Sequence, residues 1–151
     1  MEDRLSVPDY IEPIIGWRAW EIEWIGDEVR LMSVTNSVLW PRGWLSATCV
    51  RNEGSKKHHG DIPVETCSCG IYAARDRRHL LMMGYNEYLD PDDPTILGEV
   101  ALAGKVIVGT KGYRASRARP RRLYVPHSKW RLAKPLQDAY CVPVDRANPF
   151  K

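Results

Sequence analysis

The sequence contains no apolar run close to the roughly 18 residues that a membrane-spanning helix needs. Its first residues, MEDRLSVPDY, are acidic and polar, whereas a secretory signal peptide begins with basic residues and continues with an apolar segment. These two absences predict a cytoplasmic protein with no membrane partner.

Cysteine is also scarce, with four residues in a chain of 151. A chain of this length buries roughly two thirds of its unfolded surface, so it can fold without crosslinks. In a reducing compartment, neighbouring cysteines indicate metal or redox chemistry rather than a disulfide framework. We expect a single domain over residues 1–151, with a flexible N-terminal segment of about ten residues.

The motifs of several common enzyme classes are missing. The chain has no Gly-rich phosphate loop, no G-x-S-x-G elbow and no H-E-x-x-H zinc motif. Asp76 and His79 could pair as acid and base, but they are three positions apart, where a helix cap or a surface ion pair accounts for both. The sequence therefore favours a protein that is not an enzyme without deciding the question, and it gives no evidence of a small-molecule substrate.

Three cysteines and two histidines gather within the 21 residues from 49 to 69, which include the segment VETCSCG. A disulfide between residues as close as Cys67 and Cys69 would be strained. Thiolate and imidazole are ligands that zinc prefers, and four of them close a tetrahedral structural site. The sequence thus predicts one structural zinc ion, held by Cys49, one of His58 and His59, Cys67 and Cys69.

Two further interpretations of this window stay open. Cysteine often behaves as a small buried hydrophobe, so Cys49 could lie in the core while both histidines lie in an exposed Lys-rich loop. A site with three protein ligands and a water would be catalytic, with Glu53, Asp61 or Glu65 as its base. The remaining cysteine, Cys141, lies in the apolar stretch AYCVPV, and we expect it in the core.

Five segments follow one another along nearly the whole chain: GWRAWEI, SATC, CSCGIYAARD, LGEVALAGKVIVGTKGYRASRARPRRLYVP and LQDAYCVPV. The most specific pieces are CSCGIYA, with a cysteine and a histidine upstream of it, and GYRA. On these motifs the chain resembles a family of small, uncharacterised proteins encoded by actinobacteria and actinobacteriophages. The resemblance implies an architecture and a phage origin, and it implies no activity.

Alternation of apolar and polar residues with a period of two marks most of the chain as strands. It predicts strands over residues 16–26, 28–35, 44–50, 99–109, 121–125 and the final apolar stretch, with a bulge or bend at Gly104 and a hairpin turn at Lys111 and Gly112. Helical spacing predicts short helices over residues 74–84 and 136–140. The expected fold is α+β and strand-rich: a twisted mixed sheet or a partly closed barrel with two short helices, stabilised by zinc.

Basic residues are concentrated in one part of the chain. The stretch from Lys105 to Lys134 holds ten Lys or Arg and no Asp or Glu, although the net charge is only +3 and the first 28 residues hold eight acids. Arginines in a row can fork onto phosphate oxygens, and a tyrosine beside them can stack on bases. We therefore predict binding of nucleic acid through an Arg-rich strand that contains Tyr113, Arg114, Arg117, Arg119, Arg121 and Arg122.

The basic stretch would also suit a purely structural role. The arginines could pair with the acids of the N-terminal hairpin or of residues 90–93, and alternate arginines with Pro120 would fit a protected edge strand.

The main functional alternative is a phage accessory protein that binds a host protein. Six tryptophans cannot all be fully buried in so small a core, and exposed tryptophan anchors protein interfaces. The partner-binding surface would contain Trp17, Trp20 and Trp24.

Overall fold

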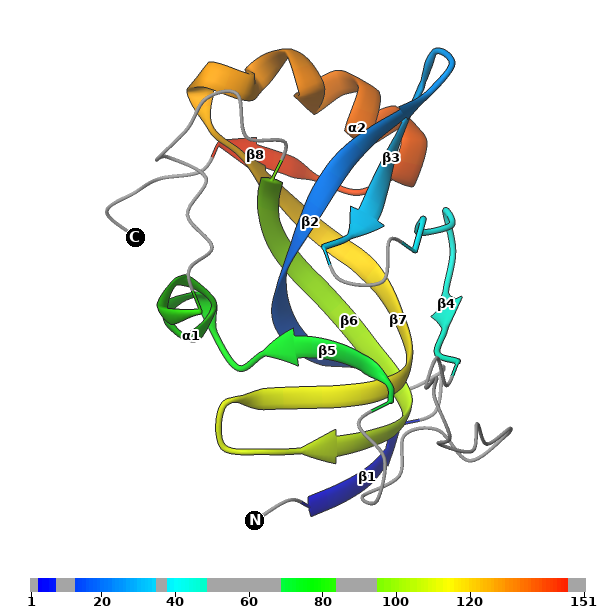
Figure 1. The fold of residues 1–151 in the computed structure, drawn as a ribbon, viewed down its shortest axis with the longest axis vertical. Helices are drawn as coiled ribbons and strands as arrows, with labels where there is room; N and C mark the ends of the chain where they lie inside the picture. Colours follow the sequence, from blue (N-terminus) through cyan, green and yellow to red (C-terminus); the bar gives the residue numbers. More distant parts are fainter. Residues whose placement is uncertain (1–2, 8–12, 35–37, 49–68, 84–94, 147–151) are drawn as a thin grey trace, which may run out of the picture.

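The computed structural model describes residues 3–7, 13–34, 38–48, 69–83 and 95–146. Within these ranges the fold is α+β, with one curved mixed sheet and two short α-helices, as the sequence predicts (Figure 1). In chain order the elements are β1 (Asp3–Val7), β2 (Ile14–Ile25), β3 (Glu28–Ser33), β4 (Leu45–Ser46), β5 (Ile71–Ala74), α1 (Arg77–Met82), β6 (Thr95–Val108), β7 (Gly112–Val125), a 3-10 helix (His127–Leu132), α2 (Ala133–Tyr140) and β8 (Val144–Arg146).

Strand pairing closes a circuit of four strands. β6 pairs with both β2 and β7, β7 pairs with β5, and β5 returns to β2 through the single pair of Trp17 with Ala74. All of these pairings are antiparallel, while β8 adds to β7 in parallel. The remaining strands extend the circuit, with β1 beside β6, β3 beside β2 and β4 beside β7. The sheet is therefore a partly closed barrel.

The main core fills the inside of this curved sheet and is centred on two tryptophans. Trp20 and Trp40 are both fully buried, and their rings meet edge to face with centroids 5.4 Å apart. Apolar side chains from the long strands and from α2 surround them, among them Leu31, Val100, Leu102, Leu123 and Leu136. The two tryptophans thus link β2 to the segment that follows β3.

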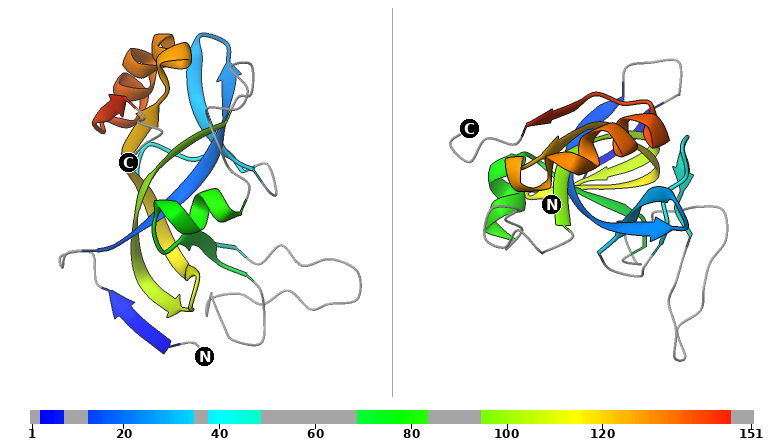
Figure 2. Two further views of the ribbon diagram at one scale, coloured as in Figure 1. Left: turned by 90° about the vertical axis from the view of Figure 1, so that its left-hand side faces the viewer. Right: turned by 90° about the horizontal axis from the view of Figure 1, so that it is seen from above.

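Helix α2 covers one end of the sheet, as both views in Figure 2 show. Its Tyr140 is buried, and the tyrosine hydroxyl accepts a hydrogen bond from the Leu31 amide at 2.7 Å and donates one to the Trp40 carbonyl at 3.0 Å. Helix α1 lies on the outside of the sheet, where Leu80 joins a second, smaller core with Ala19 and Leu97. Each helix therefore seals a different apolar surface.

Two register shifts between β6 and β7 decide which side chains of β7 face the core. One lies between Ala103 and Val106 and contains Gly104, whose positive φ of 75° suits a bulge residue, so the bulge predicted there is confirmed. The other lies opposite Glu99 and Val100 and leaves Arg121 as the extra residue of β7. Along β7 the core positions accordingly change from Ala115 to Ala118 and then to Leu123 and Val125. A strict period of two therefore fails in this strand.

The structure differs from the sequence predictions at several places. Asp3–Val7 pairs with β6 although no strand is expected in the first ten residues, and Ile71–Ala74 is a strand that the sequence pattern does not predict and that ends at Ala74, the expected start of a helix. Strand β7 is an inner strand, and Pro120 lies between the positions that pair with β4 and those that pair with β8. Cys141 is exposed, because it ends α2 in the left-handed conformation with φ of 55°.

No helix of the described part of the chain has the length and apolar character needed to cross a membrane.

Candidate nucleic-acid interface

The predicted arginine row is divided by the structure into three groups. Arg117 and Arg119 lie beside an aromatic ring, Arg121 and Arg122 lie beside carboxylates, and Arg114 is buried. All five come from one continuous strand, β7, as the sequence prediction requires. The bulges of β7, rather than simple alternation, determine which arginines share a surface.

Trp44 is the aromatic side chain that the structure places beside arginines of β7. The Arg117 and Arg119 guanidinium carbons lie 5.7 Å and 4.9 Å from the centroid of its ring. Trp44 comes immediately before β4, whose Leu45 pairs with Ala118, so the same register continued by one residue puts Trp44 opposite Arg119 of the neighbouring strand. We call this group, formed by Trp44, Arg117 and Arg119, the Trp44 cluster.

Arg119 is exposed, and Arg117 and Trp44 are half-buried. A guanidinium over an indole ring gains electrostatic attraction and keeps its edge available for hydrogen bonds. Trp44 could not be found from the sequence, because β4 and β7 are far apart in the chain and no local pattern shows that they pair. The Trp44 cluster offers planar stacking and positive charge on one surface.

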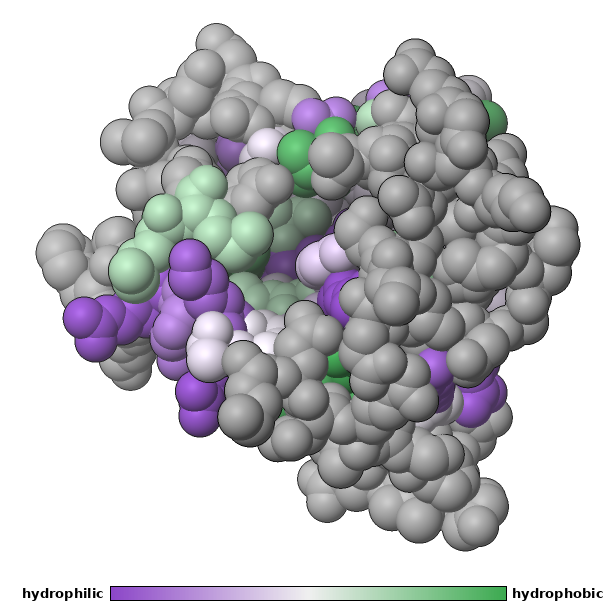
Figure 3. Space-filling model, turned by 60° about the horizontal axis from the view of Figure 1, so that its bottom comes forward, coloured by the Kyte–Doolittle hydropathy of each residue, from purple (hydrophilic) through white to green (hydrophobic). Residues whose placement is uncertain are grey.

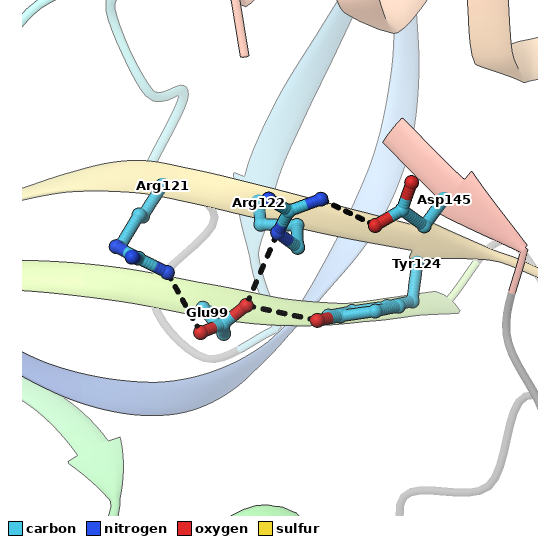
Figure 4. Close-up of polar contacts among 5 residues, drawn as sticks. All are labelled: Glu99, Arg121, Arg122, Tyr124 and Asp145. Atoms are coloured by element: carbon cyan, nitrogen blue, oxygen red, sulfur yellow. Dashed lines mark hydrogen bonds and ion pairs between the residues drawn. The ribbon is translucent and has the colours of Figure 1, made fainter. Parts of the chain in front are cut away.

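Glu99 of β6 is the centre of a second polar group, shown in Figure 4. Its carboxylate accepts from Arg121 Nη1 at 2.9 Å and from the Tyr124 hydroxyl at 2.9 Å, and it lies 3.6 Å from Arg122 Nε. Arg122 also donates to the carboxylate of Asp145 on β8. We call these residues the Glu99 network.

Two arginines of β7 are thus paired with acids, as a structural role for the basic stretch requires. The acids come from β6 and β8 rather than from the N-terminal hairpin that the sequence suggested. The acidic residues 90–93 lie outside the described part of the chain.

The environment of the Glu99 network changes the pKa values of two of its members. The hydrogen bond and the charge of Asp145 raise the pKa of Arg122, which stays protonated. Partial burial, followed by the hydrogen bond to Glu99 and the charge of that carboxylate, raises the pKa of Tyr124 to about 12. The ring of Tyr124 also stacks on Trp17 of β2, with centroids 5.3 Å apart. The network therefore joins β6, β7 and β8, and the stacked Trp17 connects it to β2.

We expect Tyr124 to ionise about two pH units above an ordinary tyrosine, whose pKa is 10.0. The neutral hydroxyl is favoured in the folded state, so its contribution to stability is complete below pH 10 and is lost as the pH rises towards about 12. Phenolate absorbance of the wild type minus that of Tyr124→Phe measures this residue alone. Half-ionisation of Tyr124 near pH 10 would contradict the assignment.

Two members of the predicted nucleic-acid site lie elsewhere. Arg114 is buried, and its guanidinium donates to the carbonyl of Cys69 at 3.1 Å. Tyr113 is half-buried and packs against the main core. Tyr113 lies on the core side of β7, whereas Arg114 lies on the outer side but is covered there, so neither shares the exposed surface of Arg117 and Arg119. These contacts hold Arg114 and Tyr113 within the fold, so the two residues do not extend the Trp44 cluster.

The three tryptophans of the alternative partner-binding surface also separate. Trp20 is in the core, Trp17 is half-buried under α1 and against Tyr124, and Trp24 is 49% exposed. Trp17 and Trp20 do lie on opposite sides of β2, as alternation predicts. However, Trp20 belongs to the main core and Trp17 packs against the smaller core. The physical reason is that the sheet is covered on both sides at this point.

Apolar side chains are exposed at several separate places of the described surface. They include Trp24 and Ile25 at the tip of the β2–β3 hairpin and Met82 and Met83 at the end of α1. In Figure 3, which brings the bottom of the molecule forward, apolar and hydrophilic residues lie directly beside one another. On this face, hydrophilic residues therefore interrupt the apolar surface.

Most of the predicted zinc ligands lie outside the described residues: Cys49, His58, His59 and Cys67. Cys69 is described and buried, two positions before the first residue of β5. Within the described ranges, no group of three or more His, Cys, Asp or Glu is placed to hold a metal ion. The structural zinc site therefore stays a prediction for residues 49–69.

Asp76 and His79 form a helix cap. The Asp76 carboxylate accepts from the His79 amide at 2.8 Å and lies 2.7 Å from the imidazole Nδ1. These hydrogen bonds lower the pKa of Asp76. The pair sits at the exposed start of α1, so the geometry matches the capping role expected from the sequence.

Comparison with protein-family models, with curated proteins and with solved structures finds no match to this chain. A function is therefore inferred from the geometry of the Trp44 cluster and the Glu99 network.

Proposed function

We propose that the Trp44 cluster binds single-stranded nucleic acid, with the two arginines on phosphates and the indole against a base. The observation that carries this proposal is the placement of the Arg117 and Arg119 guanidinium groups within 5.7 Å and 4.9 Å of one indole ring. Aromatic rings beside cations on a sheet surface are the usual means of holding unpaired bases without reading their sequence.

The spacing within the cluster suits a single strand. Residues two apart on a β-strand are separated by roughly 6 to 7 Å, a distance similar to that between successive phosphates of an extended strand. The side chain of Trp44 reaches this row from the neighbouring strand, so a base between the two phosphates would meet the ring. A paired base inside a duplex does not present its face to a side chain in this way.

The expected interaction is weak and depends on salt. Arg121 and Arg122 are paired with carboxylates and Arg114 is buried, so at most two phosphates, at Arg117 and Arg119, would be neutralised instead of three or four. Each phosphate contact on a single strand contributes about 0.7 to the slope of log affinity against log salt, which gives a total of at most about 1.4. The affinity should therefore be measurable mainly at low ionic strength.

The proposal predicts different effects for the two kinds of side chain. Trp44→Ala should lower affinity for a labelled oligothymidine roughly 5- to 150-fold, because one stacked base contributes about 1 to 3 kcal/mol, and should change duplex binding little. Arg119→Ala should lower both affinities and reduce the salt slope by about 0.7. Fluorescence anisotropy at several salt concentrations measures all of these quantities.

Two matched variants control for general effects. Trp24→Ala removes an exposed indole from the hairpin tip, and Lys134→Ala removes an exposed cation from α2. Both should bind oligothymidine like the wild type. Equal losses in Trp44→Ala and Trp24→Ala, or no binding of any nucleic acid at low salt, would count against the proposal.

A second candidate function is docking of a protein partner through the β2–β3 hairpin. The observation that favours it is the exposure of Trp24 and Ile25, at 49% and 50%, on a tip whose nearest charged neighbours in the chain are Glu23, Asp27 and Glu28. An aromatic anchor with a charged rim is common at protein interfaces. This candidate would become the preferred one if the wild type bound neither single-stranded nor duplex nucleic acid.

A further inference from the structure

We infer that Glu99 determines how many arginines of β7 are available to phosphate, an inference that rests on the proposed nucleic-acid function. Arg121 follows Arg119 by two positions along β7, and its side chain is 49% exposed. It would continue the row of Arg117 and Arg119 towards a third phosphate. Its guanidinium is instead engaged by the Glu99 carboxylate at 2.9 Å.

The Glu99 carboxylate is held in place by groups other than Arg121. It is only 15% exposed, accepts the Tyr124 hydroxyl at 2.9 Å and faces Arg122, which is itself fixed by Asp145. Because these contacts orient the carboxylate before any ligand arrives, it competes with a phosphate for Arg121 at no further ordering cost. Glu99 thus limits the site to the Trp44 cluster.

Arg122 is held more firmly than Arg121. It contacts two carboxylates, Glu99 and Asp145, and is 33% exposed, whereas Arg121 has a single carboxylate among the residues that the structure describes. Neutralising Glu99 would therefore release Arg121 and leave Arg122 paired with Asp145. The number of engaged phosphates would rise by about one.

Glu99→Gln tests this inference, because glutamine keeps the size of the side chain and can still accept from the Tyr124 hydroxyl. The variant should bind oligothymidine more tightly than the wild type at low salt, and the slope of log affinity against log salt should increase by about 0.7. Arg121→Ala is then measured in both backgrounds. It should change the wild-type affinity little and should remove most of the gain in Glu99→Gln, since only the released guanidinium contacts phosphate.

A control separates this effect from a general change of charge. Asp138→Asn adds the same unit of charge on α2, where Asp138 pairs with Lys134 at 2.7 Å, and should leave the salt slope unchanged. Thermal unfolding of each variant verifies folding, and Glu99→Ala serves as a second variant that lacks the carboxylate.

The outcomes distinguish the inference from the proposed function. If the wild type binds oligothymidine but Glu99→Gln and Glu99→Ala gain no more than Asp138→Asn, the inference is overturned and the proposed function stands. The same holds if the gain persists without Arg121. If neither the wild type nor any Glu99 variant binds, both are overturned.

Discussion

Replacing Trp20 by alanine should lower the free energy of unfolding by about 3 to 5 kcal/mol, the largest effect that we expect for a single substitution. The side chain is fully buried and meets the edge of Trp40 in the centre of the core. Its removal would leave a cavity that the rigid strands around it cannot fill. Denaturant unfolding followed by circular dichroism measures the change.

Trp24→Ala is the matched control, because it removes the same side chain from the same strand. Trp24 is about half exposed, so the expected change in unfolding free energy is within about 0.5 kcal/mol. Similar losses for the two variants would mean that Trp20 is not the core residue that the structure shows.

Tyr140→Phe should cost about 1 to 3 kcal/mol of stability through the loss of a single oxygen atom. The hydroxyl of Tyr140 accepts from the buried amide of Leu31, and this amide would be left without its partner. The Trp40 carbonyl, which accepts from the same hydroxyl, keeps two hydrogen bonds from Arg30, at 2.6 Å and 3.2 Å. The cost therefore comes mainly from one unsatisfied backbone donor.

Tyr124→Phe is the comparison for this substitution. Its hydroxyl donates one hydrogen bond, to Glu99, and that carboxylate keeps its contacts with Arg121 and Arg122. We expect a smaller loss than for Tyr140→Phe, because no buried backbone group is left unpaired. The reverse order in denaturant midpoints would show that Tyr140 does not join α2 to β3 in this way.

The fold could be predicted from the sequence where packing follows a simple period. Alternating residues in β2, β3 and β6 fill the two sides of a sheet, and the glycine at position 104 marks a real bulge. The pattern fails at Ile71–Ala74, because four residues are too short to distinguish a strand from the first turn of the helix after it. The spacing of apolar residues distinguishes a strand from a helix only when the segment is long enough to contain several repeats of that spacing.

The functional surface was less predictable, for two physical reasons. Each bulge reverses which residues of β7 face outward, so Tyr113 appears aligned with Arg117 in the sequence but packs against the core in the structure. The aromatic partner of the arginines, Trp44, reaches them through a pairing between distant segments. Counting basic residues also misses Glu99 and Asp145, which lie outside the acid-free stretch.

The central position of β6 has a consequence for synthesis on the ribosome. The β2–β3 hairpin can form as soon as its residues emerge, but the other edge of β2 lacks its full sheet partner until the chain has grown past Leu102, which pairs with Ile14. The circuit then needs β7 as well. The aromatic side chains of the hairpin therefore stay uncovered in the nascent chain until β6 and β7 have been synthesised. We expect the barrel to close late, and chaperones can bind the uncovered hairpin before then.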